Sequence, residues 1–380
     1  MLKRSFVSIM LVCLGAFGCQ TEEISSKSPT LTLEKHIEVT PDETYSYGAF
    51  CRVNPFENSN DFFVTFGGSS PIATISLNEM EARAGGAEGG NGYSYKIYDE
   101  NFDYTEENGI VSNSGGDAAS VYAEGYYFFL AGAPEGWKLQ KIDPSAWEVV
   151  DSITIEMDES HEARNDQMLA YANGQLIASS LYDPSNESKE MDQLNTDPSI
   201  GYGTHNRIFN MDLELLDYFI LEDTPHINAS YVVYEDGIYN YITSTALFGD
   251  LIVLQYDEDW NYIGVKTIAE HSNWSQGAVY DKETDSFYVT YIDFGELMNG
   301  KLLPGNAPNT IVGVYDKQWN LIEKIAVTSY TGDDLTHAGR PSVILSGNKL
   351  YVSYDVETFD ETTREENKDW QCTVDIYRIQ

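Results

Sequence analysis

The chain has 380 residues, enough for one large β domain or two ordinary domains. Its 61 acidic and 22 basic residues give a formal net charge of −39, which excludes nucleic acid as a partner because phosphate binding requires a basic surface. The acids are scattered along the chain. They favour solubility in a saline or extracellular setting, and affinity for divalent cations or cationic ligands is the alternative.

Residues 1–18 have the pattern of a secretory signal. Lys3 and Arg4 precede an apolar run over residues 6–16, which is too short and wrongly flanked to cross a membrane as a helix. We therefore expect residues 1–18 to be removed before the protein folds.

The end of this segment resembles a bacterial lipobox, because residues 16–18 (Ala-Phe-Gly) precede Cys19. The resemblance implies that Cys19 is acylated and that residues 19–30 form a lipid-anchored tether. Gln20 stands where an inner-membrane retention Asp would stand, and the acidic pair at residues 22–23 resembles the surface-export signal of Bacteroidota lipoproteins. The implied location is the bacterial outer membrane, facing outward. A plain cleaved secretory signal is the alternative.

Beyond residue 30 the chain predicts an all-β fold. Short runs rich in Tyr, Val, Ile and Phe alternate with Gly, Asn and Asp turns, and the pattern recurs six times with room for four strands in each repeat. The predicted repeats are residues 48–113, 114–157, 158–223, 224–268, 269–334 and 335–380. The sixth repeat lacks a fourth strand, whereas residues 33–40 match the fourth strand of repeat five at residues 321–328.

Residues 31–380 therefore resemble a six-bladed β-propeller with four-stranded blades, in which the N-terminal strand completes the last blade. Closing the ring removes the exposed sheet edges that an open array would have. Together with the lipobox, this architecture resembles six-bladed surface lipoproteins of the Bacteroidota type. That resemblance concerns architecture and brings no assigned activity with it.

Two further patterns concern the framework of the propeller. An Asp in the turn between the third and fourth strands is expected to bond its own backbone, with Trp147, Trp260 and Trp319 packing beside it. These residues are Asp99, Asp143, Asp212, Asp257 and Asp316. Cys51 and Cys372 fall in strands that ring closure brings near each other. The sequence therefore allows two alternatives, a disulfide between them or two buried thiols.

Four of the six histidines recur in phase, each just before the first strand of a repeat. They are His161, His226, His271 and His337. In a propeller these connections share a face with the loops between the second and third strands, which are long at residues 67–92, 180–204, 293–309 and 355–370. Histidines and long loops would then lie on one face, where binding sites usually occur.

Each phased histidine has a carboxylate within about four residues upstream, so the ring is a plausible site for zinc, manganese or iron. It resembles the channel-mouth metal site of propeller polysaccharide lyases, which implies a divalent metal as a cofactor. The alternative is a repeated structural element, in which each histidine caps an inner strand by bonding to the neighbouring blade.

Residues that break the repeat are better candidates for ligand specificity. They follow the histidines by three or five positions and are Arg164, Asp166, Tyr231, Trp274, Gln276 and Arg340. Two arginines and a tryptophan near an acidic channel can grip a carboxylate or stack on a sugar. The alternative is ion pairing between blades.

A glycosidase interpretation is weaker. Arabinanase-like propellers place three acids at the starts of inner strands, for which Asp117, Glu162 and Asp166 are the available residues. That family has five blades, and repeat one offers Cys51 and Arg52 where an acid should stand. The chain has no Gly-x-Ser-x-Gly, phosphate-loop, Cys-x-x-Cys or His-Glu-x-x-His motif.

The sequence thus favours a non-enzymatic surface lipoprotein that binds an extracellular ligand, a glycan or a metal chelate, on its loop-rich face. An outer-membrane transporter is a candidate partner, and the membrane is met only through the lipid. The alternatives are a metal-dependent polysaccharide lyase or glycoside hydrolase, and a structural or adhesion scaffold.

Overall fold

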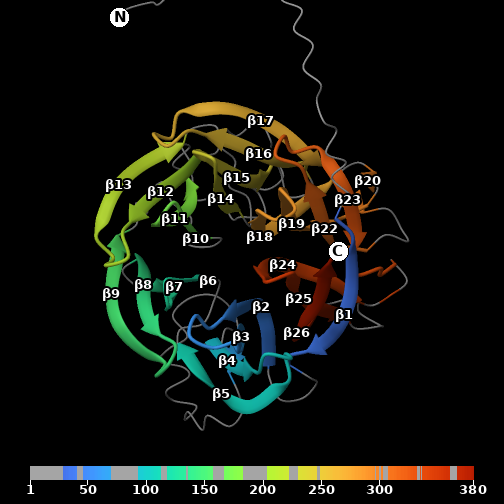
Figure 1. The fold of residues 1–380 in the computed structure, drawn as a ribbon, viewed down its shortest axis with the longest axis horizontal. Coiled ribbons are helices and arrows are strands. Elements are labelled where there is room, and N and C mark those ends of the chain that lie inside the picture. Colours follow the sequence, from blue (N-terminus) through green and yellow to red (C-terminus); the bar gives the residue numbers. More distant parts are fainter. Residues whose placement is uncertain are drawn as a thin grey trace, which may run out of the picture.

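The structure is a computed structural model in which six four-stranded antiparallel sheets surround one axis (Figure 1). It describes residues 29–40, 46–69, 93–112, 118–133, 136–156, 167–182, 203–221, 230–245, 249–295, 297–298, 301–302, 307–331, 334, 336–359 and 366–380. The predicted six-bladed β-propeller is therefore confirmed. Across these ranges, no helix has the length and apolar character needed to cross a membrane.

The first three blades follow one another along the chain, each running from its inner to its outer strand. Blade 1 contains β2 (Ser46–Pro55), β3 (Phe62–Ser69), β4 (Tyr93–Tyr98) and β5 (Tyr104–Ser112). Blade 2 contains β6 (Ala118–Ala123), β7 (Tyr126–Ala133), β8 (Gly136–Asp143) and β9 (Glu148–Glu156). Blade 3 contains β10 (Met168–Ala172), β11 (Gln175–Tyr182), β12 (Gly203–Phe209) and β13 (Leu215–Leu221).

The other three blades complete the ring. Blade 4 contains β14 (Tyr231–Glu235), β15 (Ile238–Ser244), β16 (Leu251–Tyr256) and β17 (Tyr262–Ala269). Blade 5 contains β18 (Ser272–Asp281), β19 (Ser286–Asp293), β22 (Asn309–Tyr315) and β23 (Leu321–Ala326), with a small hairpin of β20 (Leu297–Met298) and β21 (Lys301–Leu302). Blade 6 contains β24 (Thr336–Ser346), β25 (Lys349–Phe359), β26 (Glu366–Ile379) and β1 (Leu31–Glu38).

The chain closes as predicted, with the N-terminal strand as the outer strand of blade 6. β1 pairs antiparallel with β26 from Leu31↔Ile379 to Glu38↔Thr373, two residues earlier than expected. The predicted long loop at residues 355–370 is largely wrong, because β25 and β26 remain paired as far as Phe359↔Glu366. β26, with 14 residues, is the longest strand in the part of the chain that the structure describes.

A disulfide between Cys51 and Cys372 joins blade 1 to blade 6, which resolves the two alternatives left by the sequence. Both cysteines are fully buried. They share an apolar cluster with Phe62 and Tyr351, whose ring centroids are 4.6 Å apart across the same two blades. Blades 1 and 6 are thus joined by a covalent bond and by apolar packing, and both oppose the separation of these two blades.

The turns between third and fourth strands follow the predicted pattern, with one correction. The carboxylates of Asp99, Asp257 and Asp316 each accept two backbone N–H bonds from the turn that follows. In blade 3 this role belongs to Asn210, which accepts bonds from the backbones of Asp212 and Glu214, so the assignment to Asp212 was wrong. An amide oxygen serves as well as a carboxylate because either one only has to accept.

An aromatic or aliphatic residue late in each of these turns adopts left-handed backbone geometry. The residues are Phe102, Trp147, Leu213, Trp260 and Trp319, with φ between 54° and 60°. Trp260 stacks on Tyr239 and Trp319 on Phe287, each with centroids 4.3 Å apart. Such geometry costs free energy for a bulky residue, and the aromatic stacking offsets it.

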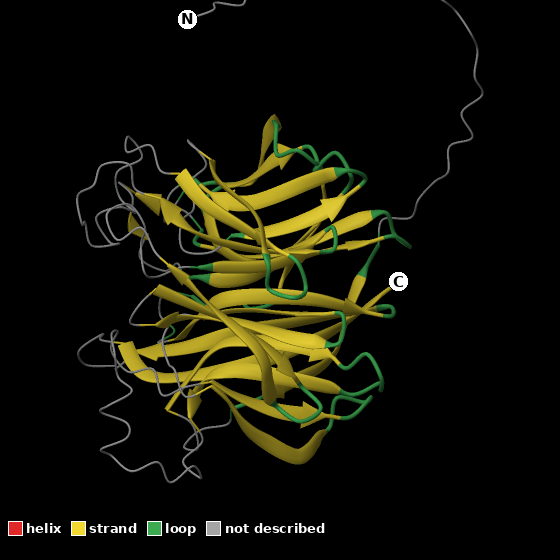
Figure 2. Ribbon diagram, turned by 90° about the vertical axis from the view of Figure 1, so that its left-hand side faces the viewer, coloured by secondary structure: helices red, strands yellow, loops and turns green. Residues whose placement is uncertain are grey.

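The short turns that join first to second and third to fourth strands lie together at one face of the ring, on the right of Figure 2. Inner strands run toward this face, so its turns follow the ends of β2, β6, β10, β14, β18 and β24. We call it the turn face. The inner strands begin at the opposite end, which we call the entry face.

Candidate functional site

The channel along the propeller axis contains a cavity of about 570 Å³. All six inner strands contribute to its wall, which includes Arg52 from β2, Tyr231 from β14 and Ser342 from β24. At the turn face the wall includes Tyr122, Tyr171, Tyr234 and Tyr280, each next to last in its inner strand. The two ends of the channel therefore differ in chemistry, with arginine toward the entry face and tyrosines at the turn face.

Three neighbouring inner strands are irregular toward the entry face. The register of β2 against β3 shifts between Ser46 and Arg52, that of β18 between Asn273 and Gly277, and that of β24 between Gly339 and Ser342. The inner strands β6, β10 and β14 pair with no shift. Bulges of this kind redirect side chains and are common beside binding sites. Blades 5, 6 and 1 therefore form one sector, which we call the bulged sector.

Arg340 lies in the bulge of β24 and has a φ of 43°, a left-handed geometry that is unfavourable for a side chain of this size. Its Nη1 is 3.3 Å from Oδ2 of Asp355, and the Asp355 carboxylate is fully buried. The other oxygen of Asp355 accepts a bond from the backbone N–H of Cys51, at 3.4 Å. Asp355 thus fixes the Arg340 guanidinium, and 21% of the Arg340 side chain stays exposed.

Arg52 lies beside this pair. Loss of hydration lowers the pKa of its guanidinium, and the nearby charges of Tyr93 and Asp355 partly offset that effect. One of its nitrogens donates to the carbonyl oxygen of Cys51 at 2.8 Å. On the opposite blade, burial raises the pKa of Tyr231, and the positive charge of Arg52 acts against the rise. The charge of Arg52 in blade 1 therefore acts on Tyr231 in blade 4.

The structure places only part of the predicted site. Tyr231 lines the axial cavity, Arg340 lies in the bulge of β24, and the backbones of Trp274 and Gln276 lie in the bulge of β18. Arg164, Asp166, His161, His226 and Cys19 lie outside the described residues, and only the backbone of His337 is described. The structure thus gives the positions of the candidates in blades 4, 5 and 6, and ligand binding by any of them stays a prediction.

His271 is exposed, and its main chain connects blades 4 and 5. Its backbone has a φ of 49°, and its N–H donates to Asp250 at 3.3 Å. Its carbonyl oxygen accepts a bond from Phe294 at 3.1 Å. Among the residues that the structure describes, no three His, Cys, Asp or Glu side chains are grouped to hold one metal ion. Metal binding by His161, His226, His271 and His337 therefore stays a prediction.

Sequence reasoning missed two members of this site. From the sequence, Arg52 was noted only as a residue that stands where an arabinanase-like propeller would have an acid. Asp355 was assigned to a loop. Arginine is scarce in the chain, so its presence in an inner strand was an available signal. For Asp355 the signal was a lone acid in a strongly apolar strand, whose burial requires a cationic or hydrogen-bonding partner. The glycosidase candidates Asp117, Glu162 and Asp166 lie outside the described residues.

No protein-family model matches this chain, and no curated protein matches its sequence. Among solved structures, it is similar to a member of the DUF4221 family from Bacteroides vulgatus at 11% identity, with 93% of this chain and 99% of that chain covered and a TM-score of 0.46. A neuraminidase-like protein of A/little yellow-shouldered bat/Guatemala is similar at 9% identity, 92% and 99% coverage and a TM-score of 0.48.

A xylan β-1,4-xylosidase from Bacillus halodurans is similar at 11% identity and a TM-score of 0.43, over 68% of this chain and 52% of that chain. This chain thus spans about half the length of that enzyme. Likenesses at this level do not carry an activity across, so the function has to be argued from the residues themselves.

Proposed function

We propose that this protein is an exported, lipid-anchored binding protein that takes up an extracellular ligand, a glycan or a metal chelate, at the entry face of the bulged sector. The observation that carries the proposal is the arrangement of Arg340 on Asp355. A buried carboxylate orients a guanidinium that remains partly exposed, in a strand whose backbone departs from regular geometry to place it.

This arrangement suits a ligand that presents a carboxylate. A guanidinium is planar and offers paired N–H donors that match a carboxylate in two parallel hydrogen bonds. Arg52 and Tyr231 lie farther along the same channel and add a second cation and an aromatic ring. Acidic sugars and carboxylate-bearing chelates share this chemistry, and a ring such as Trp274 from β18 would stack on a sugar.

Titration calorimetry with a panel of ligands tests the proposal. The panel holds a uronic-acid oligosaccharide, its neutral counterpart, and an iron–citrate chelate. We expect an acidic ligand to bind, and Arg340→Gln to weaken it by about tenfold. Lys282→Gln is the matched control because Lys282 lines the same channel at the turn face. Equal binding of the neutral sugar, or an Arg340→Gln variant that binds like the parent, would contradict the proposal.

The cellular part of the proposal rests on the N-terminal sequence, where Cys19 follows an apolar run and precedes an acidic pair. Metabolic labelling with a fatty acid should mark the protein and should fail for Cys19→Ala. Protease treatment of whole cells should digest the protein if it faces outward. An outer-membrane transporter that receives the ligand is the partner we expect, and crosslinking in cells with the ligand present tests for it.

The enzymatic alternative makes a different prediction. A metal-dependent lyase would convert a polyuronate to unsaturated products, which absorb in the ultraviolet, and His226→Ala or His271→Ala would abolish the reaction. Elemental analysis of the protein purified without chelator would then find near-stoichiometric transition metal. Binding without turnover and without metal supports the binding function, and turnover would replace it.

A further inference from the structure

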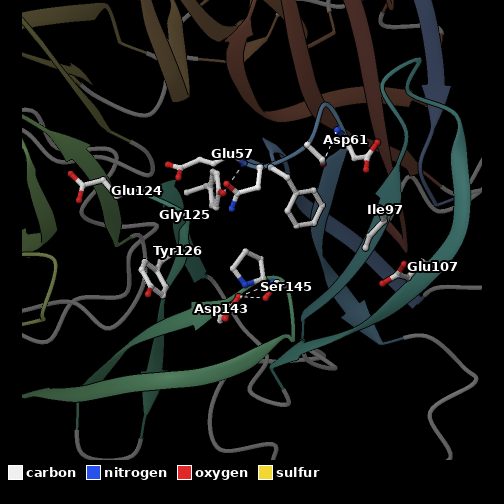
Figure 3. Close-up of a pocket in the computed structure, with 14 residues that line it drawn as sticks. Glu57, Asp61, Ile97, Glu107, Glu124, Gly125, Tyr126, Asp143 and Ser145 are labelled. Carbon is white, nitrogen blue, oxygen red and sulfur yellow. Dashed lines mark hydrogen bonds between the residues drawn. The ribbon is translucent and has the colours of Figure 1, made fainter.

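A second cavity of about 570 Å³ lies at the turn face between blades 1 and 2 (Figure 3). It shares only Tyr122 with the axial cavity and is reached from the side where the short turns lie. Its described lining contains no lysine or arginine, and its carboxylates are Glu57, Asp61, Glu107, Glu124 and Asp143. Phe56, Ile97 and Pro144 add apolar surface. The cavity therefore combines strong negative potential with room for a hydrocarbon chain.

The carboxylates come from the β2–β3 and β6–β7 turns, from β5 and from the end of β8, and they surround the space rather than meeting at one point (Figure 3). Glu57 belongs to the turn after β2, and its backbone N–H donates to the hydroxyl of Tyr122 at 3.1 Å. Glu124 accepts a bond from the hydroxyl of Tyr171. Two bonds from Ser145 lower the pKa of Asp143, so this carboxyl stays ionised. The framework around the cavity is thus held in place by hydrogen bonds.

The chain itself shows which group fits such a place, because blade 5 has the same arrangement with a lysine in it. Lys317 follows Asp316 in the turn between third and fourth strands, and its Nζ lies 2.7 Å from Asp236 and 3.2 Å from Asp285. The ammonium also lies over the ring of Tyr280, 5.2 Å from the centroid. The hydrogen bond to Asp236 is the main cause of a raised pKa for Lys317. Two carboxylates and an aromatic ring therefore hold an ammonium here.

Blade 2 repeats these positions without the lysine. Tyr122 is next to last in β6, as the blade 5 tyrosine is in β18, and Glu57 belongs to the turn of the preceding blade, as Asp236 does. Glu124 precedes β7 in the turn of the same blade. Where Lys317 follows its turn aspartate, Pro144 follows Asp143, and proline has no ammonium to offer. Pro144 itself lines the cavity.

We propose that the cavity between blades 1 and 2 binds an external alkylammonium group, which takes the place that Lys317 fills in blade 5. The cation would be held by the Glu57 and Glu124 carboxylates and the Tyr122 ring, and its alkyl chain would lie against Pro144 and Ile97. A free diamine and a lysine side chain of a partner protein share this chemistry. The site lies on the opposite face from the proposed ligand site and does not depend on it.

Calorimetry of the full chain with 1,5-diaminopentane tests the proposal, with 1,5-pentanediol as the uncharged counterpart. We expect one saturable, salt-sensitive site for the diamine and none for the diol. Glu57→Gln should weaken binding by about tenfold. Glu214→Gln, in the turn between the third and fourth strands of blade 3 on the same face, is the control and should bind like the parent. No diamine binding, or equal binding of the diol, would overturn the proposal.

Two substitutions test the comparison between blades 2 and 5, one by adding a lysine to blade 2 and the other by removing the lysine from blade 5. Pro144→Lys should place an internal ammonium in the cavity and abolish diamine binding. Lys317→Ala should open a second site in blade 5 and raise the stoichiometry from one to two. A Pro144→Lys variant that folds, by its circular dichroism and Tm, and still binds diamine would overturn the assignment.

Competition identifies the source of the amine. A lysine-containing peptide that binds more tightly than diaminopentane indicates a protein partner, and the reverse order indicates a small amine. Both results support an ammonium site. Calcium that displaces the diamine at equal concentration would show a general cation site and overturn the ammonium assignment.

Discussion

The two ends of the channel are built on opposite principles. At the turn face similar residues recur in most blades: a turn Asp or Asn and a left-handed aromatic or leucine in blades 1 to 5, and a tyrosine next to last in the inner strands of blades 2 to 5. At the entry face three inner strands bulge, and Arg52 and the ion pair of Arg340 with the buried Asp355 lie in this irregular sector. Repetition marks what every blade needs to fold, and departures from it mark what a single ligand needs.

The largest effect should follow from removing the buried acid of the entry face. Asp355→Ala removes the buried carboxylate that contacts the guanidinium of Arg340 and accepts the N–H of Cys51. We expect the free energy of unfolding to fall by about 4 kcal/mol, measured by urea denaturation. Asp212→Ala is the control because 84% of that side chain is exposed. A similar loss of unfolding free energy in Asp355→Ala and Asp212→Ala would contradict the proposed difference between the entry face and the turn face.

The disulfide should come next. It joins residues 321 positions apart and so restricts the unfolded chain strongly. Replacing both Cys51 and Cys372 by Ala should cost about 3 kcal/mol, and reduction of the parent protein should cost a similar amount. The double variant should not respond to reductant. An unchanged Tm of the parent under reducing conditions would show that the apolar packing alone closes the ring.

A smaller difference should separate two variants at Arg340. Arg340→Ala and Arg340→Gly both lose the contact with Asp355, but only glycine adopts a φ of 43° without steric cost. We expect the glycine variant to be more stable by about 1 kcal/mol in denaturant melts. Equal stability would mean that the bulge relaxes when the guanidinium is gone, and that the geometry is a consequence of the contact.

The smallest effect should appear at the turn face. Asp257→Asn keeps an acceptor for the turn, as Asn210 does in blade 3, but loses the charge. The side-chain bond from Asn261 lowers the pKa of Asp257, so the charge stabilises the fold above the unfolded pKa and ceases to do so as pH falls through the folded one. We expect Tm to fall by about 1 °C near pH 7 and by nothing near pH 2. A difference that persists in acid would point to lost bonds instead.

The sequence predicted the propeller because each blade carries its own local signals. Strand runs, turn residues and the match between residues 33–40 and 321–328 all report on contacts within one repeat or between identical repeats. Asp212 was misassigned for the same reason: the pattern recorded an acid in the turn, and Asn210, two positions earlier, accepts the same bonds. Local signals thus locate an element better than they identify the atom that caps it.

The candidate site was only partly predictable, because its members come from different blades. Arg340 stood out by its distance from a phased histidine, but its partner Asp355 lies on the next strand and was placed in a loop. The cavity between blades 1 and 2 was also hidden. The sequence shows that Pro144 follows Asp143 as Lys317 follows Asp316. Only the structure shows that Lys317 contacts two carboxylates, which gives the comparison its meaning.

The sequence by itself determined the class of fold, the number of blades, the closure by the N-terminal strand and the acidity of the surface. These follow from periodicity and composition, which act within one repeat or on the chain as a whole. Only the tertiary structure decided that Cys51 pairs with Cys372, that Asp355 orients Arg340, and where the bulges and cavities lie. Those depend on contacts between residues far apart in the chain, and burial gives them their strength by excluding water.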